Sequence, residues 1–348
     1  MRVLGESYRT IWFDAVEEAV AILDQTALPD ALRVARISSL DGMCEAIRTM
    51  RVRGAPLIGV SAAFGLWLAM REDPTDEGLD AAVRALTATR PTAVNLRWAV
   101  DLAARAVRGA LAEERPALAR AFAEGLAEMD VETCRAIGAR GAAALRERFA
   151  HKLEGTLEIL THCNAGWLAT VDVGTALAPV YALHDAGYGV HVWVSETRPR
   201  DQGLLTEWEL RQHGVPCTLL ADNAAGHVLA SGRVDACIVG SDRTTRRGDV
   251  CNKIGTYLKA LAAAAHGVPF YVALPTSTID LSLEDGAAIP IEERSQNELF
   301  GGSAEARGER HAWNPAFDVT PAKLVTALIT ERGVVPATES AITALFAR

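Results

Sequence analysis

Apolar residues in the first half of the chain recur at three- and four-residue spacing, as in Leu79 to Leu86 and Leu96 to Leu111. This period is typical of amphipathic helices. Two interruptions, Asp73-Pro74-Thr75 and Glu114-Arg115-Pro116, have the composition of helix stops and starts. The pattern therefore predicts a mostly helical region from about Ser39 to about Phe149.

After His151 the pattern changes to short apolar, β-branched runs separated by helix-like stretches. The runs predicted as strands are Thr10–Phe13 and Leu32–Ile37 before the helical region, and Leu157–Cys163, Val190–Ser195, Cys217–Leu220, Ala236–Val239 and Pro269–Leu274 after it. Strands that alternate with helices indicate βαβ units and a parallel sheet with right-handed crossovers. We therefore predict an α/β fold, with a mostly helical N-terminal domain at 1–150 and a Rossmann-like doubly wound parallel-sheet domain at 151–348.

This topology places two reactive side chains together. In open α/β sheets, ligands bind beyond the carboxyl ends of the strands where the strand order reverses. With the five strands of the second domain in the order 3-2-1-4-5, that point lies between the first and the fourth strand. The first strand ends at Cys163, and Asp242 follows the fourth. We therefore expect the thiol and the carboxyl group to face one crevice.

Both residues also have a purely structural interpretation, since a cysteine usually acts as a small buried hydrophobe. We assign that role to Cys44, Cys134, Cys217 and Cys237. Cys163 differs because it lies between a strand and a predicted helix start, where backbone N–H groups and the helix dipole stabilise a thiolate or an anion. Asp242 remains open between a site residue and a helix N-cap.

A dinucleotide cofactor is the main competing expectation, since Glu196 ends the second strand as a ribose-binding acid does. The segment Asn164 to Ala169 stands where a G-x-G-x-x-G loop belongs. It places the large Trp167 where the backbone has to approach a pyrophosphate. We therefore expect no cofactor.

Charge and composition exclude further classes. The 348 residues carry a net charge of −9 and no Lys/Arg-dense run, which argues against nucleic-acid binding. No stretch reaches the roughly 18 apolar residues of a membrane-spanning helix, and the N-terminus does not resemble a signal peptide. The cysteines and the eight histidines lack metal-site spacing, so we expect a cytoplasmic protein with reduced thiols and no metal. His162 points to the opposite face of its strand from Cys163 and is predicted to be a core residue or a group that supports the site from behind.

The segment Thr161 to Thr170, THCNAGWLAT, is similar to the active-site segment of methylthioribose-1-phosphate isomerases. Those enzymes belong to the family that includes the regulatory subunits of the initiation factor 2B exchange complex. Six further matches occur in order along nearly the whole chain. They are Arg53 to Pro56, Arg90 to Leu96, Glu196 to Pro199 with Gln202-Gly203, Gly240 to Arg243, Gly248 to Thr256 and Asn314 to Asp318. Such a series makes the resemblance specific.

The resemblance implies an aldose–ketose isomerase that converts 5-methylthioribose 1-phosphate to 5-methylthioribulose 1-phosphate in methionine salvage. It implies that Cys163 and Asp242 are the catalytic pair. The residues implied to bind the substrate are Arg53, Gly54, Ala55, Arg90, Gln202, Asn252 and Lys253. It further implies a homodimer whose small-molecule partner is a phosphorylated sugar.

These residue types suit that reaction. The phosphate on the anomeric carbon prevents simple ring opening, and a carboxylic acid kept neutral by a dry pocket is able to protonate the ring oxygen. We hypothesise that Asp242 has this role and that a Cys163 thiolate acts as base, or stabilises charge, while hydrogen moves from C2 to C1. The cations expected to hold the phosphate are Arg53, Arg90 and Lys253. Gly54 and Gly166 are expected to let the backbone approach an anion.

Departures from the family pattern are few. Ser241, Thr244 and the pair Arg246-Arg247 stand where Ala, Ile and smaller or neutral residues are usual. The arginine pair is expected near the anion site, which keeps 5-deoxyribose 1-phosphate or ribose 1,5-bisphosphate open as substrates. A non-catalytic regulatory subunit of the initiation factor 2B type is a further alternative, and the presence of both Cys163 and Asp242 argues against it.

Overall fold

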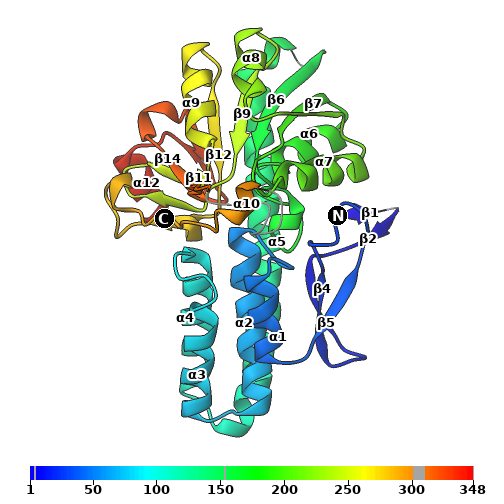
Figure 1. Ribbon diagram of the computed structural model, residues 1–348, viewed down its shortest axis with the longest axis vertical. Coiled ribbons are helices and arrows are strands. Elements are labelled where there is room, and N and C mark those ends of the chain that lie inside the picture. The colour runs from blue at the N-terminus through cyan, green and yellow to red at the C-terminus, as the bar shows by residue number, and fades with distance from the viewer. Residues whose placement is uncertain (4, 153, 301–309, 348) are drawn as a thin grey trace.

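The structure is a computed structural model that describes residues 1–3, 5–152, 154–300 and 310–347. Two parts are stacked along its long axis: a column of helices from the first part of the chain, and a helix-flanked sheet from the second (Figure 1). The predicted α/β class, with a mostly helical part followed by a Rossmann-like part, is confirmed.

The helices of the column cover the span predicted for them. They are α1 (Leu40–Arg48), α2 (Ala55–Glu72), α3 (Asp76–Thr87), α4 (Val94–Arg108) and α5 (Arg115–Arg148). The predicted breaks are confirmed: Thr75 caps α3 by accepting a hydrogen bond from the N–H of Gly78, and Pro116 lies in the first turn of α5. Leu57 to Met70 of α2 are buried without interruption, because the other four helices pack around α2.

A three-stranded antiparallel sheet precedes the column. Its strands are β3 (Ile11–Asp14), β4 (Ala19–Leu23) and β5 (Val34–Ile37), with β4 in the centre. The outer strands agree with the prediction, whereas β4 was not predicted. All five of its residues are buried, so it lacks the alternation that marks a half-exposed strand. Two further strands of two residues each, β1 (Arg2–Val3) and β2 (Glu6–Ser7), pair antiparallel near the N-terminus.

The main sheet has the order β16-β15-β12-β9-β6-β7-β8. Its strands are β6 (Thr156–His162), β7 (Gly189–Ser195), β8 (Cys217–Leu220), β9 (Ala236–Val239), β12 (Phe270–Ala273), β15 (Ala327–Ile329) and β16 (Val334–Val335). The five predicted strands are β6, β7, β8, β9 and β12. Their parallel pairing gives the predicted order 3-2-1-4-5. The short strands β15 and β16 extend one edge and were not predicted.

A second, four-stranded sheet was also not predicted. Its order is β13 (Ile279–Asp280), β10 (Arg243–Thr245), β11 (Val250–Lys253) and β14 (Phe317–Thr320). It begins where the chain leaves β9, so Asp242 lies at its entrance, and Asn252 and Lys253 end β11. This small sheet therefore brings the chain back to the carboxyl ends of the main strands.

The remaining α-helices accompany the two sheets. Among the residues that the structure describes, they are α6 (Ala178–Asp185), α7 (Gln202–His213), α8 (Ala224–Ala230), α9 (Thr256–Ala265), α10 (Asn297–Phe300) and α12 (Glu339–Phe346). Within the described residues, none of the helices is both long and apolar enough to cross a bilayer.

Hydrophobic packing continues across the predicted division at residue 150. The second half of α5 packs against α6, and Ile137 and Leu145 of α5 share a core cluster with Ile159 and Val192 of the main sheet. The domain boundary itself stays a prediction. The continuous core fixes the helical column relative to the sheet, and the site lies at their junction.

Candidate active site

A cavity of about 100 Å³ lies at the junction of the helical column and the carboxyl ends of β6 and β9. All nine residues predicted for the site line it: Arg53, Gly54, Ala55, Arg90, Cys163, Gln202, Asp242, Asn252 and Lys253. Part of the remaining wall is apolar, formed by Ile58, Val94, Ile289, Pro290 and Phe317. The fold thus brings the predicted residues together from both halves of the chain.

Cys163 directly follows β6 and has a left-handed backbone, with φ +66°, which is uncommon for a residue other than glycine. The predicted helix start behind it is wrong. The next α-helix, α6, begins at Ala178, and the loop before it contains one 3-10 turn, Trp167–Ala169. Burial raises the pKa of the Cys163 thiol, and the cations Arg53 and Lys253 oppose that rise. The raised pKa favours the thiol over the expected thiolate in the resting site.

Asp242 lies between β9 and β10. Its backbone N–H donates to the carbonyl oxygen of Cys251 at 2.9 Å, and no helix begins there, so the N-cap interpretation is wrong. Burial raises the pKa of the carboxyl group, against the opposing effect of Lys253, Arg90 and Arg53. The direction is the one required of a carboxylic acid that stays neutral in a dry site.

Arg53 is buried just before α2. Its Nη1 donates to Oδ1 of Asn164 at 2.5 Å, and its Nη2 to the carbonyl oxygen of the same residue at 2.8 Å. Burial lowers the pKa of the guanidinium, and the nearby Cys163 favours its charged form. Gly54 has φ +100°, and a Cβ atom there would lie 2.4 Å from the carbonyl oxygen of Ala169. Glycine thus lets the Arg53 segment pack against the loop that follows Cys163.

The other two predicted cations already have partners. Arg90 forms an ion pair with Glu292 at 3.1 Å, and the ammonium group of Lys253 lies 4.4 Å from the ring centre of Phe317. Burial lowers the pKa of Lys253, while Cys163 favours its charged form. The three predicted cations therefore all line the cavity, and Arg90 among them is paired with a carboxylate.

Gln202 and Asn252 contribute polar groups. Gln202 is the first residue of α7, and its buried Oε1 has no hydrogen-bond partner within the described part of the chain. Asn252 donates from Nδ2 to Oγ1 of Thr256 at 3.1 Å. Helix N-termini therefore do reach the cavity, but they belong to α2, α4 and α7, through Ala55, Val94 and Gln202, and not to a helix behind Cys163.

Sequence reasoning did not single out Asn164, Arg243 or Glu292. Asn164 stands inside the segment THCNAGWLAT, so its proximity to Cys163 was available as a signal. Arg243 lines the cavity and donates to the carbonyl oxygen of Thr92 at 3.0 Å, which ties the two halves of the molecule together. Glu292 has no motif around it, and only the tertiary structure places it against Arg90.

Gly166 approaches a different anion from the expected one. A Cβ atom at this residue would lie 1.4 Å from Oε1 of Glu209, a fully buried carboxyl group on α7. Glu209 accepts hydrogen bonds from the N–H of Leu168 at 3.1 Å and from Nδ2 of Asn164 at 3.2 Å. Burial raises its pKa to about 8. Gly166 therefore makes room for an internal acid behind the loop, and not for a ligand phosphate.

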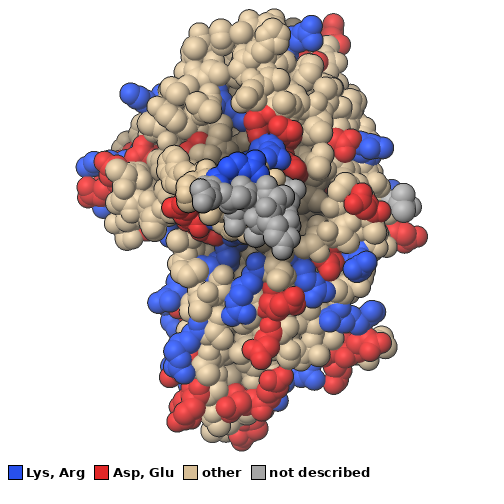
Figure 2. Space-filling view, in the orientation of Figure 1, with Lys and Arg blue, Asp and Glu red and all other residues tan. Residues whose placement is uncertain are grey.

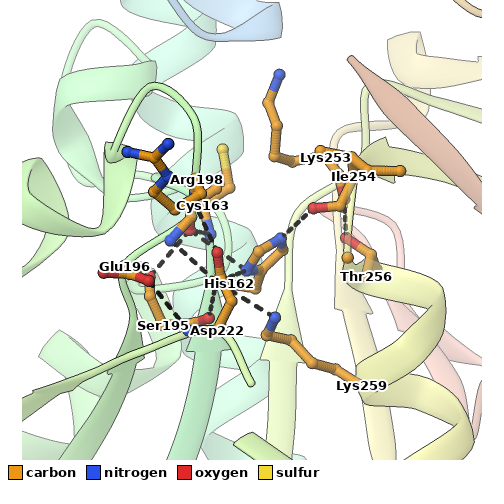
Figure 3. A network of polar contacts seen from close by, with 12 residues as sticks. His162, Cys163, Ser195, Glu196, Arg198, Asp222, Lys253, Ile254, Thr256 and Lys259 are labelled. Atoms are coloured by element: carbon orange, nitrogen blue, oxygen red, sulfur yellow. Dashed lines mark hydrogen bonds and ion pairs between the residues drawn. The ribbon is translucent and has the colours of Figure 1, made fainter. Parts of the chain in front are cut away.

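His162 is buried, as predicted for a core residue. Its ring points toward the backbone of Ile254 (Figure 3), with Nε2 at 2.8 Å from that carbonyl oxygen. Burial and the neighbouring Lys259 lower its pKa to about 3, so the imidazole is neutral. Across residues 1–3, 5–152, 154–300 and 310–347, no three His, Cys, Asp or Glu residues are grouped as a metal site requires.

The arginine pair Arg246-Arg247 does not line the cavity. Both residues form ion pairs with Glu284 and Glu339. The expectation that they lie at the anion site is therefore wrong.

Comparison with known proteins gives a consistent result. Residues 51–337 match the initiation factor 2 subunit family. The methylthioribose-1-phosphate isomerase of Methylorubrum populi is 57% identical, over 99% of this chain and 98% of that protein. The crystal structure of 5-methylthioribose 1-phosphate isomerase from Pyrococcus horikoshii is 40% identical, with a TM-score of 0.86 over 98% of this chain and 96% of that one.

A structure described as initiation factor eIF-2B subunit delta from A. fulgidus is likewise 40% identical, with a TM-score of 0.83 over 98% of this chain and 100% of that one. The likeness thus extends to proteins named for catalysis and for translation initiation. With this fold, this cavity and matches over its full length, the chain belongs to the initiation factor 2 subunit family, and among its members it is similar to the methylthioribose-1-phosphate isomerases.

Proposed function

We propose that the protein is an aldose–ketose isomerase that converts 5-methylthioribose 1-phosphate to 5-methylthioribulose 1-phosphate. The observation that carries this proposal is the convergence of the nine predicted residues on one cavity, in a chain 57% identical to a protein named for that activity. A place in methionine salvage, a cytoplasmic location and a homodimeric state remain predictions from the same resemblance.

The charge distribution supports a small anionic substrate. The protein carries a net charge of −9, and Lys and Arg are mixed with Asp and Glu over the helical part of the face in Figure 2. Four cations nevertheless line the cavity: Arg53, Arg90, Arg243 and Lys253. A local positive pocket in an acidic protein suits a phosphate monoester, because charge-assisted hydrogen bonds hold its oxygens.

The wall of the cavity supports an apolar substituent on C5. Its apolar members include Ile58, Val94, Ile289 and Phe317, which suit a methylthio group. Arg246 and Arg247 are engaged with Glu284 and Glu339 outside the lining. The cation pair that would have favoured a bisphosphate is therefore absent from the lining.

In the proposed mechanism the neutral carboxyl group of Asp242 donates a proton to the ring oxygen as the sugar ring opens. Cys163, which lines the same cavity, assists the transfer of hydrogen from C2 to C1. Its thiol is held near two cations, so a thiolate formed during the reaction has charge partners. Retention of the C2 deuterium in product formed in water would favour hydride transfer, and its exchange would favour a proton and an enolate.

The activity is tested directly with 5-methylthioribose 1-phosphate and the purified protein, followed by phosphorus NMR. We expect conversion to the ketose phosphate, with 5-deoxyribose 1-phosphate converted more slowly and ribose 1,5-bisphosphate least. Preference for the bisphosphate would replace the proposed substrate, while turnover of none of the three would favour the non-catalytic role suggested by the A. fulgidus relative's name.

The role of Cys163 is tested by Cys163→Ala. We expect kcat to fall by at least about 100-fold, the low end for loss of an acid–base group. Cys237→Ala is the matched control, because Cys237 is a buried cysteine of the same sheet outside the cavity. Near-normal turnover by Cys163→Ala would remove the thiol from the mechanism.

A further inference from the structure

The backbone of Cys163 is held on both sides by buried threonine hydroxyl groups. Its N–H donates to Oγ1 of Thr197 at 2.8 Å, and its carbonyl oxygen accepts from Oγ1 of Thr206 at 2.8 Å. Both threonines are fully buried. Thr197 follows β7, whereas Thr206 lies in α7, so two separate segments hold the two peptide groups on either side of the Cys163 Cα atom.

Thr197 is itself held in an unusual conformation. Its φ of +67° lies in the left-handed region, where a β-branched residue is a genuine outlier. Such a conformation persists where the surroundings enforce it, and it clusters at functional sites. Thr197 and Cys163 are both left-handed, and the hydrogen bond between them joins the two exceptional residues.

Asp222, which follows β8, fixes the backbone of Thr197. Its Oδ1 accepts from the N–H of Thr197 at 3.0 Å and from the hydroxyl group of Ser195, and its Oδ2 accepts from the N–H of Arg198 at 2.7 Å. Burial acts to raise the pKa of Asp222, but the Ser195 hydroxyl and the Lys259 ammonium at 3.5 Å hold it below its ordinary value. An anionic carboxylate therefore anchors Thr197 from behind.

His162 links the same assembly to the lysine of the cavity. Since a carbonyl oxygen only accepts, the neutral imidazole donates from Nε2 to Ile254, the residue next to Lys253. Its other nitrogen, Nδ1, lies 3.3 Å from Oγ1 of Thr197. Figure 3 shows the His162 ring between the Cys163 and Ile254 segments. The Cys163 sulfur and the Lys253 amine both point away from this ring.

We propose that Thr197 and Thr206 are positioning residues that clamp the Cys163 peptide groups and so hold the thiol toward Arg53 and Lys253. Neither threonine lines the cavity, so each acts through Cys163. This inference rests on the proposed function, because it assigns the clamp to the reacting thiol. An unclamped loop would let the thiol move away from the two cations, and a misplacement of about 1 Å costs up to about 100-fold in rate.

The test compares Thr197→Val and Thr206→Val with Thr197→Ser and Thr206→Ser. Valine keeps the shape of threonine and removes the hydroxyl group, whereas serine restores it. Thr161→Val is the control, because Thr161 is buried on β6 two residues before Cys163 and donates to the carbonyl oxygen of Ile238 instead. Thermal unfolding verifies that each variant is folded.

In steady-state assays we expect both valine variants to lose at least about tenfold in kcat, with KM within about twofold of the wild type. The serine variants and Thr161→Val stay within about threefold of the wild-type kcat. Serine variants that fall as far as the valine variants would overturn the clamp, since the hydroxyl groups would then be immaterial.

A second readout does not depend on turnover. The rate of iodoacetamide labelling of Cys163, followed by peptide mass spectrometry across pH, reports the thiol's titration. We expect the midpoint to rise by about one pH unit in the valine variants, the size expected when a thiolate loses a cation within about 4–6 Å. An unchanged midpoint in both valine variants would overturn the clamp even if the protein proved to have another substrate.

Because there are two threonines, the proposal stays testable if one valine variant does not fold. If the strained position 197 does not accept valine, Thr206→Val carries the same expectations, because its site is an ordinary helix interior. Full turnover by Cys163→Ala would reject the proposed role of the thiol, whereas the labelling midpoint would still decide whether the threonines position it.

Discussion

Two acids near Arg53, the half-buried Asp242 and the fully buried Glu209, are alike in the direction of their pKa shift and differ in their hydrogen bonds. Burial raises the pKa of both Asp242 and Glu209. Asp242 lines the cavity, and no hydrogen bond to its carboxyl group forms within the described residues. Glu209 lies behind the Cys163 loop and accepts hydrogen bonds from Leu168 and Asn164. A shifted pKa alone therefore does not mark a reacting group.

The two acids differ in whether their carboxyl oxygens already accept hydrogen bonds from the protein. Glu209 uses its oxygens to hold the loop that carries Asn164, and Asn164 in turn holds Arg53. Asp242 keeps its oxygens for whatever enters the cavity. The comparison teaches that the acid with internal partners stabilises the site, while the acid without them is available for chemistry. Four experiments test this division.

The largest expected effect is that of Asp242→Asn on turnover. An amide cannot protonate the ring oxygen as a carboxylic acid does, so we expect kcat to fall by at least about 100-fold. The measurement is steady-state kinetics with 5-methylthioribose 1-phosphate, with thermal unfolding to verify folding. Near-normal kcat would assign the proton transfer to another group and end the contrast with Glu209.

Gly166→Ala is expected to have the largest effect on stability. The new Cβ would lie 1.4 Å from Glu209 Oε1, so we expect the free energy of unfolding in urea to fall by about 2 kcal/mol or more. Glu209→Ala removes the clashing carboxyl group, and the double variant should recover part of the loss. Strict additivity of the two changes would show that Gly166 is not required by Glu209.

The third prediction concerns the protonation of Glu209, which should make the stability of the folded protein depend on pH. Its pKa is about 8 in the folded protein and 4.5 without the fold, so between these values the folded state binds more protons than the unfolded state. Stability from this group is therefore full below pH 4.5 and is lost as the pH rises toward 8. From pH 5 to 8 we expect the wild type to lose at least about 1 kcal/mol more than Glu209→Gln. Parallel curves would mean that Glu209 does not hold its proton.

The smallest expected effect is that of Glu209→Gln on turnover. The residue does not line the cavity, and one altered hydrogen bond is worth about 1 kcal/mol. We therefore expect kcat to change by less than about fivefold in the assay used for Asp242→Asn. A loss comparable to that of Asp242→Asn would place Glu209 in the chemistry.

Much of the main sheet was predictable because its strands are short, apolar and separated by helices. The predicted run Cys217–Leu220 coincides with β8, and Ala236–Val239 coincides with β9. The strand β4 and the small sheet around β11 were missed. The first is buried on both faces, and the second depends on pairing between segments far apart in the chain, so neither has a local signature.

The site shows the same division. Reversal of strand order between the first and the fourth strand was enough to bring Cys163 and Asp242 to one cavity, and the resemblance supplied the cations. The helix predicted behind Cys163 was wrong, because a buried loop held by Glu209 replaces it. The arginines at 246 and 247 were misplaced because glutamates distant in sequence pair with them.

The sequence by itself determined the α/β class, the parallel strand order and the residues that meet at the strand ends, since these follow from periodicity and chain topology. Only the tertiary structure decided the protonation and orientation of those residues. Burial raises the pKa of Cys163, and the hydroxyl groups of Thr197 and Thr206 hold its backbone. Desolvation and hydrogen bonding depend on which distant segments pack together, and no local pattern encodes that packing.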